Sequence, residues 1–268
     1  MCHLSSCRWL LLLLVVAVAA CDKTPTGRRQ LTLIPESQIE RLGVQTFARL
    51  KRTQPMEVSP QINALVRCVA KTIIDMLPNQ QSPWEVVVFR DAQPNAFVLP
   101  GGKIGINTGI LRVTENPAQL ATIIGHEVAH VLADHANERM TQELGIQAVF
   151  YLLRFFGNDE GDWQRELVEK GLGLGARYGV LLPYSRIHEQ EADVLGLQLM
   201  ARAGFDPRAS LDFWQNMAQV SRDQPPELMS THPSHNSRVE TLQAEMDQAL
   251  ELQQAARKAG RQPGCALP

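Results

Sequence analysis

The chain has 268 residues, of which 44% are hydrophobic and 20% are charged. This composition is that of a folded domain rather than a disordered chain, and the length suffices for one substantial domain. The 26 Lys and Arg residues nearly balance the 28 Asp and Glu residues, for a formal net charge of -2. Because the sequence also contains no basic stripe, it argues against nucleic-acid binding.

The N-terminus has the pattern of a secretory signal. Arg8 precedes an apolar run from Leu10 to Ala20, which is too short for a membrane span but suits a signal peptide. The run ends in small residues followed by Cys21 and resembles the bacterial lipobox, in which cleavage precedes a cysteine that is then acylated. We expect a signal peptide at residues 1–20 and a lipid anchor at Cys21. The alternative is an ordinary signal peptide, with Cys21 incidental.

This leader predicts a periplasmic protein held at a membrane through its N-terminal lipid. Asp22, directly after the anchor, indicates the inner membrane in some bacteria, and the outer membrane stays an alternative. Besides the anchor Cys21, the mature chain would keep Cys68 and Cys265, and an oxidising compartment permits a disulfide between these two. Such a bridge would tie the C-terminal tail to an N-terminal helix. The alternative is two unpaired thiols.

Hydrophobic periodicity and turn residues divide the mature chain into segments. Residues 21–36 are polar, contain two prolines and predict a flexible tether before one domain at 37–258 and a tail at 259–268. The predicted helices are 38–51, 60–77, 117–140, 141–157, 161–180, 184–203, 207–222 and 236–258. The predicted strands are 84–89, 95–99 and 103–108, the last two forming a hairpin. A small antiparallel sheet among many helices indicates an α+β domain. The most apolar segment, 144–156, predicts a core or lid helix, with a segment that dips into the membrane as the alternative.

The sequence HEVAH at residues 126–130 lies in a strongly helical run. His126 and His130 are about one helical turn apart, so both imidazoles project from one face and can bind one zinc ion per chain. Glu127, about 100° around the helix from His126, can reach a zinc-bound water rather than the metal. Zinc lowers the pKa of that water to about 7, so a carboxylate can take its proton at neutral pH. The alternative is a surface helix with incidental histidines.

A third ligand is needed, and the extended HExxHxxGxxH pattern does not supply it. Ala133 and Ala136 stand at its glycine and third histidine positions. His135 does not replace the missing ligand, because it lies about 180° from His126 around the helix. We expect His135 to be packed or hydrogen-bonded on the back of the helix.

The segment from Glu189 to Asp193 offers a carboxylate ligand instead. These two residues are one helical turn apart, so they share a face of the predicted helix. Glu189 would complete a His₂Glu site, and Asp193 would accept the other ring N–H of a ligating histidine. Glu191, which points elsewhere, is the rival ligand.

A polar loop after these helices contains further candidates. His232 could donate a hydrogen bond to the oxyanion of a tetrahedral intermediate, or it could bind zinc in a resting form. A third interpretation of His232 is a capping or turn residue. For His235, this third interpretation is the favoured one. Arg238 could stabilise the oxyanion or orient a carboxylate.

Together these segments resemble the gluzincin zinc metalloproteases that include CAAX prenyl proteases and HtpX-type enzymes, most closely the periplasmic lipoprotein (LoiP/YcaL-like) members. The resemblance covers about residues 60–240 and rests on four segments: NAFVLPGGKIGINTGIL, IIGHEVAHVLADHANER, LPYSRIHEQEADVLGLQLMARAGFDP and STHPSHNSR. It implies a zincin-like domain with zinc at His126, His130 and Glu189, Glu127 as general base, Asp193 supporting a ligand, and His232 near the metal.

The resemblance also gives the predicted hairpin a function. In such enzymes an edge strand beside the metal-binding helix pairs with an extended substrate, and here that strand comprises Asn95, Ala96, Phe97 and Val98. The alternative is a purely structural hairpin. Without transmembrane helices after the leader, processing of prenylated proteins is less favoured than proteolysis of extracytoplasmic proteins.

Three functions compete. The leading hypothesis is a zinc endopeptidase that removes misfolded or misassembled envelope proteins. A cell-wall amidase would share the metal chemistry, but no wall-binding segment is evident in the sequence. The third hypothesis is a latent lipoprotein with a chaperone or scaffold role, whose zinc is blocked by His232.

Overall fold

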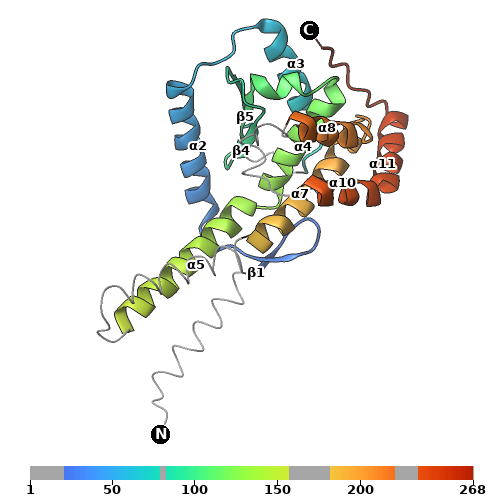
Figure 1. Cartoon of the computed structure of the whole chain (residues 1–268). Helices are drawn as coiled ribbons and strands as arrows, with labels where there is room; N and C mark the ends of the chain where they lie inside the picture. The colour runs from blue at the N-terminus through green and yellow to red at the C-terminus, as the bar shows by residue number, and fades with distance from the viewer. Residues whose placement is uncertain (1–20, 79–82, 157–181, 221–234, 268) are drawn as a thin grey trace.

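The computed structural model describes residues 21–78, 83–156, 182–220 and 235–267. Within them, helices surround a small sheet, which confirms the α+β prediction (Figure 1). The signal peptide, the predicted helix at 161–180 and His232 lie outside the described residues. The described helices are α2 (Glu36–Thr53), α3 (Pro60–Ile74), the 3-10 helix η1 (Thr108–Arg112), α4 (Pro117–Leu132), α5 (His135–Phe156), α7 (Leu182–Arg202), α8 (Ala209–Val220), α10 (His235–Ala244) and α11 (Met246–Lys258). The strands are β1 (Cys21–Lys23), β2 (Arg29–Leu31), β3 (Glu85–Phe89), β4 (Ala96–Leu99) and β5 (Lys103–Asn107).

The central sheet has the strand order β3-β5-β4. The predicted hairpin is confirmed, because β4 pairs antiparallel with β5. Its turn places Gly101 and Gly102 at φ values of 80° and 69°, a left-handed region that glycine adopts without strain. The sheet is mixed rather than wholly antiparallel, since β3 runs parallel to β5. Strand β4 forms an edge and packs against α4.

The N-terminal segment departs from the tether predicted for residues 21–36. Strands β1 and β2 form an antiparallel hairpin, and the chain beyond it is bonded to α5. The backbone N–H of Leu33 donates to Thr141 Oγ1 at 3.0 Å, and Asn137 Nδ2 donates to the carbonyl of Ile34 at 2.9 Å. Polarity predicted the exposure of this segment but not the side-chain partners that hold it.

The helix predicted at 117–140 is broken after Leu132. Asp134 has φ 51°, a left-handed conformation that aspartate tolerates better than most residues do, and α5 then starts at His135. The break changes the direction of the chain between the two helices. The helix predicted at 236–258 is likewise divided, into α10 and α11.

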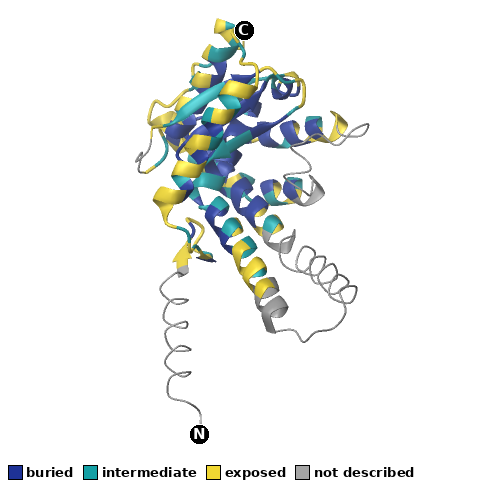
Figure 2. Ribbon diagram, turned by 90° about the vertical axis from the view of Figure 1, so that its left-hand side faces the viewer, coloured by how far each residue is buried: buried dark blue, intermediate teal, exposed yellow. Residues whose placement is uncertain are grey.

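Helix α4 lies at the centre of the molecule and contacts α3, α7, α8 and β4 (Figure 1). All residues from Gln119 to Ala129 are buried, so the helix has no solvent-facing side over three turns. Its first turn is well formed: Pro117 occupies the start of the helix, and the Asn116 side chain accepts a hydrogen bond from the Gln119 backbone N–H. Figure 2 shows the buried centre of the molecule and, on α5, the half-buried and exposed residues 142–148.

Helices α4 and α7 are in close backbone contact at two glycines. A Cβ on Gly196 would lie 2.8 Å from the backbone nitrogen of His126, and a Cβ on Gly125 would lie 2.9 Å from the carbonyl oxygen of Gly196. Neither helix could carry a larger residue here without moving. The two glycines therefore set the distance between α4 and α7.

The C-terminal tail is fixed to the body. A disulfide joins Cys68 on α3 to Cys265 across 197 residues of sequence, as predicted.

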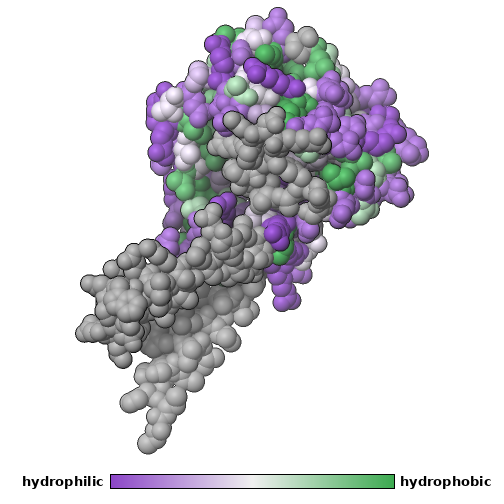
Figure 3. All heavy atoms as spheres, viewed as in Figure 1, coloured by the Kyte–Doolittle hydropathy of each residue, from purple (hydrophilic) through white to green (hydrophobic). Residues whose placement is uncertain are grey.

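Among the described residues, no helix is both long and apolar enough to cross a membrane. In Figure 3, the coloured surface of the body is mostly hydrophilic, with smaller hydrophobic areas between.

The glycine contact gives a matched pair of substitutions. Gly196→Ala should lower the free energy of unfolding by about 1–3 kcal/mol, because the methyl group has no room between the helices. Gly145→Ala, at an exposed position on α5 with nothing within 4 Å, should raise it by about 0.5–1 kcal/mol through helix propensity. Urea unfolding of both variants measures the difference, and equal effects would contradict the close helix contact.

Candidate metal centre

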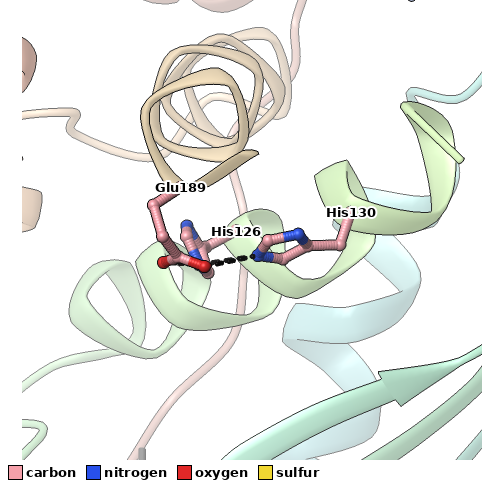
Figure 4. Close-up of side chains that lie close together, drawn as sticks. All are labelled: His126, His130 and Glu189. Atoms are coloured by element: carbon pink, nitrogen blue, oxygen red, sulfur yellow. Dashed lines mark hydrogen bonds and ion pairs between the residues drawn. The ribbon is translucent and has the colours of Figure 1, made fainter. Parts of the chain in front are cut away.

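Three donor atoms from two helices converge at one point (Figure 4). His126 Nε2 lies 3.1 Å from His130 Nε2 and 3.3 Å from Glu189 Oε2, while His130 Nε2 lies 3.5 Å from Glu189 Oε1. Ligands held about 2.1 Å from a tetrahedral zinc ion are about 3.4 Å from one another. The spacing and chemistry of this donor set therefore fit a zinc ion.

The ligand set is enclosed on one side and accessible on the other. His126 and Glu189 are buried, with 2% and 3% of their surface exposed, whereas the side chain of His130 is 15% exposed. Access to the site is therefore on the side of His130. Glu127, on the same turn of α4 as His126, is also buried beside the ligand set.

The ion pair of Asp193 and Arg238 lies at the Nδ1 side of the His126 ring. Its Nδ1 lies 3.1 Å from Asp193 Oδ1, and Arg238 Nε donates to Asp193 Oδ2 at 2.9 Å. Arg238 Nη1 also lies 3.2 Å from Glu189 Oε2. The guanidinium lies 3.6 Å from the centre of the Trp214 ring, which gives the buried cation an aromatic face as well.

The environment of His126 favours positive charge at this point. Burial and the Arg238 guanidinium lower the pKa of the ring, but hydrogen bonds with Asp193 and Glu189 outweigh them and raise that pKa to about 9. Burial raises the pKa of Asp193, yet Arg238 and His126 hold it below its usual range. Zinc would have to displace the ring proton, because only a neutral imidazole binds a metal.

His130 is supported through a second histidine. Its Nδ1 lies 2.8 Å from His135 Nδ1, and His135 Nε2 lies 3.2 Å from Glu191 Oε2. His135 is hydrogen-bonded, as one of the two expectations had it, but its predicted place on the back of the helix is wrong, because the break at Asp134 turns His135 toward His130. Glu191 is outside the ligand set, and its carboxylate lies behind His135.

A buried cluster continues from there to the N-terminal hairpin. Arg28 donates through Nη1 and Nη2 to both oxygens of Glu138, at 2.9 and 2.7 Å, and through Nε to Glu191 Oε2 at 2.8 Å. The ring of His188 stacks on His135 at 4.3 Å, and its Nε2 lies 2.8 Å from Glu138 Oε2. Four ionisable side chains behind the ligand set are thus paired with one another and with Arg28.

Electrostatics keeps both carboxylates of this cluster ionised. Burial raises the pKa of Glu138, but hydrogen bonds from His188 and Arg28 outweigh it and hold the pKa at about 2. Burial also raises the pKa of Glu191, and hydrogen bonds from His135, from nearby threonines and from Arg28 hold it well below its usual range. The same contacts, led by the bond to Glu138, raise the pKa of Arg28.

Along the edge strand β4, successive residues direct their backbone N–H and C=O groups alternately toward β5 and away from it. The N–H of Asn107 donates to the carbonyl of Asn95 at 3.0 Å, so the next hydrogen-bonded pair in this register is Phe97 with Gly105. The intervening residues Ala96 and Val98 therefore direct their N–H and C=O groups away from β5. Among the described residues, no strand pairs with β4 on that side.

Some predicted residues cannot be placed, and several supporting residues were not predicted. His232 lies outside the described residues, and α10 begins at His235. Sequence reasoning missed Arg28, Glu138, His188 and Trp214 as neighbours of the site. For Glu138 a signal existed: it follows His135 by three residues, so the two share a face of a helix that starts anew after Asp134.

Comparison with known proteins agrees with this arrangement. The model of peptidase family M48 matches residues 60–246. Mitochondrial metalloendopeptidase OMA1 of Schizosaccharomyces pombe is 34% identical over 183 residues, which cover 68% of this chain and 52% of that protein. The human metalloendopeptidase OMA1 is 32% identical over 242 residues (85% and 46%), and the Escherichia coli beta-barrel assembly-enhancing protease is 24% identical over 236 residues (84% and 48%).

The chain spans about half the length of these relatives. The names of these relatives do not bear on the predicted likeness to CAAX, HtpX-type or LoiP/YcaL-like members, so that finer assignment stays a prediction. The family itself is established, because its match extends over well more than half of the sequence and includes all three converging side chains. This chain belongs to peptidase family M48.

Proposed function

We propose that this chain is a zinc-dependent endopeptidase, anchored by lipid in the bacterial envelope, that hydrolyses misfolded or misassembled extracytoplasmic proteins. The convergence of His126, His130 and Glu189 carries the proposal, because two imidazoles and one carboxylate are the ligands of many catalytic zinc sites. The relatives add support: they are named as metalloendopeptidases and as a beta-barrel assembly-enhancing protease.

The proposed reaction divides between the metal and the protein. When bound, zinc would polarise the scissile carbonyl and make an attacking water acidic near neutral pH. Glu127 takes the proton of that water and passes it to the leaving amine, which suits a buried carboxylate on the same helical turn as a ligand. His130 marks the accessible side from which the substrate enters.

Supporting side chains fix the geometry of this reaction. With zinc bound, Asp193 would accept the Nδ1–H of His126, whose Nδ1 lies 3.1 Å from Asp193 Oδ1 and 2.8 Å from Arg238 Nη2, so that Nε2 would present its lone pair to the metal. Arg238 orients the carboxylates of Asp193 and Glu189. We assign His232 to stabilisation of the oxyanion, on the basis of its sequence context alone.

An extended substrate would pair with β4. Ala96 and Val98 supply the outward N–H and C=O groups, whereas Phe97 packs its ring with Phe47 and Phe89. Main-chain pairing of this kind tolerates many side chains in the substrate. It requires that the bound part of the substrate be extended, because that part adds to the sheet as a strand beside β4. Unfolded proteins supply such segments, which supports a role in removing damaged proteins.

The envelope location rests on the N-terminal sequence, whose apolar run ends at Cys21. In a bacterial host fed radiolabelled palmitate, the wild-type chain should become labelled and should fractionate with membranes. Cys21→Ala should lose both the label and the membrane association, because the acylated thiol is gone. Equal labelling of both proteins would refute the anchor, and Cys7→Ala serves as a control that should leave labelling unchanged.

Metal removal tests the ligand set. Zinc added to the chelator-stripped full-length chain at about 100 times its Kd should stabilise the fold by about 2.7 kcal/mol. Glu189→Ala should abolish this zinc-dependent gain, while Gln190→Ala, an exposed neighbour on the same helix, should keep it. Thermal unfolding with and without zinc measures both. A full zinc response in Glu189→Ala would remove Glu189 from the ligand set.

The role of Glu127 separates catalysis from metal binding. Glu127→Gln should retain one zinc per chain but cleave casein about 10²–10⁴-fold more slowly, because the amide cannot accept a proton. Glu251→Gln, at an exposed position on α11, is the matched control and should cleave normally. Metal analysis and casein cleavage are measured on the same samples. Zinc bound without cleavage by the wild type would instead favour a latent or scaffolding lipoprotein.

A further inference from the structure

One guanidinium of the N-terminal hairpin joins two helices behind the metal centre. Arg28 binds Glu138 of α5 with both Nη atoms and Glu191 of α7 with Nε, all at 2.7–2.9 Å. Both carboxylates are buried, and the Arg28 side chain itself is only 22% exposed. Thr26, from the same hairpin, donates a hydrogen bond to Glu191. The hairpin thus supplies the positive charge that these two buried carboxylates share.

The contacts continue from Glu191 to a metal ligand. If His130 presents Nε2 to the metal, its Nδ1 carries the proton and donates to His135 Nδ1. His135 then carries its own proton on Nε2 and donates to Glu191. This assignment gives every contact one donor and one acceptor, and it fixes the orientation of both rings.

We propose that Arg28 is a positioning residue of the metal centre: by holding Glu191 against His135, the N-terminal hairpin fixes the ring of His130 and so raises the affinity for zinc. The inference rests on the proposed zinc site and extends it to Arg28, which precedes His130 by 102 residues and lies outside the region that matches the family. His126 receives equivalent support from Asp193 and Arg238, but His130 receives it through the hairpin.

The geometry requires arginine rather than any cation. Three donors in one plane reach two carboxylates at once, and the ammonium of lysine, as a point charge, cannot reproduce that fork. Without the guanidinium, the two buried carboxylates would keep only hydrogen bonds from histidine and threonine, and Glu191 would lose the charged contact that holds it toward His135. The rings of His135 and His130 would then lose their fixed orientation.

Zinc affinity of the full-length chain tests the inference. Arg28→Met should raise the zinc Kd about 10- to 100-fold, as loss of a group that orients a ligand does, and Arg28→Lys should restore part of the loss. Competition with a chromophoric chelator measures the Kd. The visible spectrum of the cobalt-substituted protein, which responds to ligand geometry, should change in Arg28→Met and return toward wild type in Arg28→Lys.

Arg29→Met and Arg29→Lys are matched controls, since Arg29 lies on the same hairpin but is exposed. Both should leave the Kd and the cobalt spectrum unchanged. If Arg28→Met does not fold, Arg28→Lys decides, because it keeps the charge and loses only the fork. Variants of Arg28 with lower thermal stability but wild-type zinc affinity and spectrum would overturn the inference. Failure of the wild type to bind zinc would overturn the proposed function as well.

A double variant tests the route. If Arg28 acts through His135, then Arg28→Lys in a His135→Gln background should add little to the loss of zinc affinity that His135→Gln causes alone. Additive losses would show that Arg28 reaches the metal by another path and would overturn the proposed relay.

Discussion

The close contact of α4 and α7 is the constraint on which the metal centre depends. Two histidines one turn apart can share a metal, but the third ligand must come from another helix at a fixed distance. Gly125 and Gly196 permit that approach, because neither backbone is held away by a side chain. The same contact determines where the residues of α7 on either side of Glu189 meet α4 and α5. Ligands and their supporting side chains are therefore positioned by one packing arrangement rather than by separate loops.

Burial of so many ionisable groups requires that each be paired. Removing one partner from a buried ion pair typically costs about 3–5 kcal/mol, since the other charge is left without compensation. Here two arginines meet the requirement at opposite ends of the site: Arg238 for Asp193 and Glu189, and Arg28 for Glu138 and Glu191. The pairing is specific as well as stabilising, because each guanidinium fork fits its carboxylates in one orientation. Precise ligand geometry follows from the need to neutralise buried charge.

The sequence predicted what depends on local periodicity. The spacing of His126 and His130, and the shared face of Glu189 and Asp193, required only that each segment be helical, and each is. The position of His135 depended instead on whether the helix continued, and the break at Asp134 reversed the prediction. Contacts with Arg28 could not be predicted, because a polar segment with two prolines gives no sign of which buried carboxylates it will meet. The roles of residues outside the described ranges, such as His232, stay predictions.

The side chains that support His126 and those that support His130 come from different parts of the chain. Asp193 and Arg238 lie within the region that matches the family, as do Glu138, Glu191 and His135, but Arg28 precedes that region. The matched region of this chain thus contains two buried carboxylates whose guanidinium partner lies outside that region. Because the hairpin begins at Cys21, the segment that supplies this partner is also the one predicted to carry the lipid. Attachment to the membrane and geometry of the metal centre would then depend on the same dozen or so residues, and displacement of the hairpin would loosen His130 while leaving His126 held by Arg238.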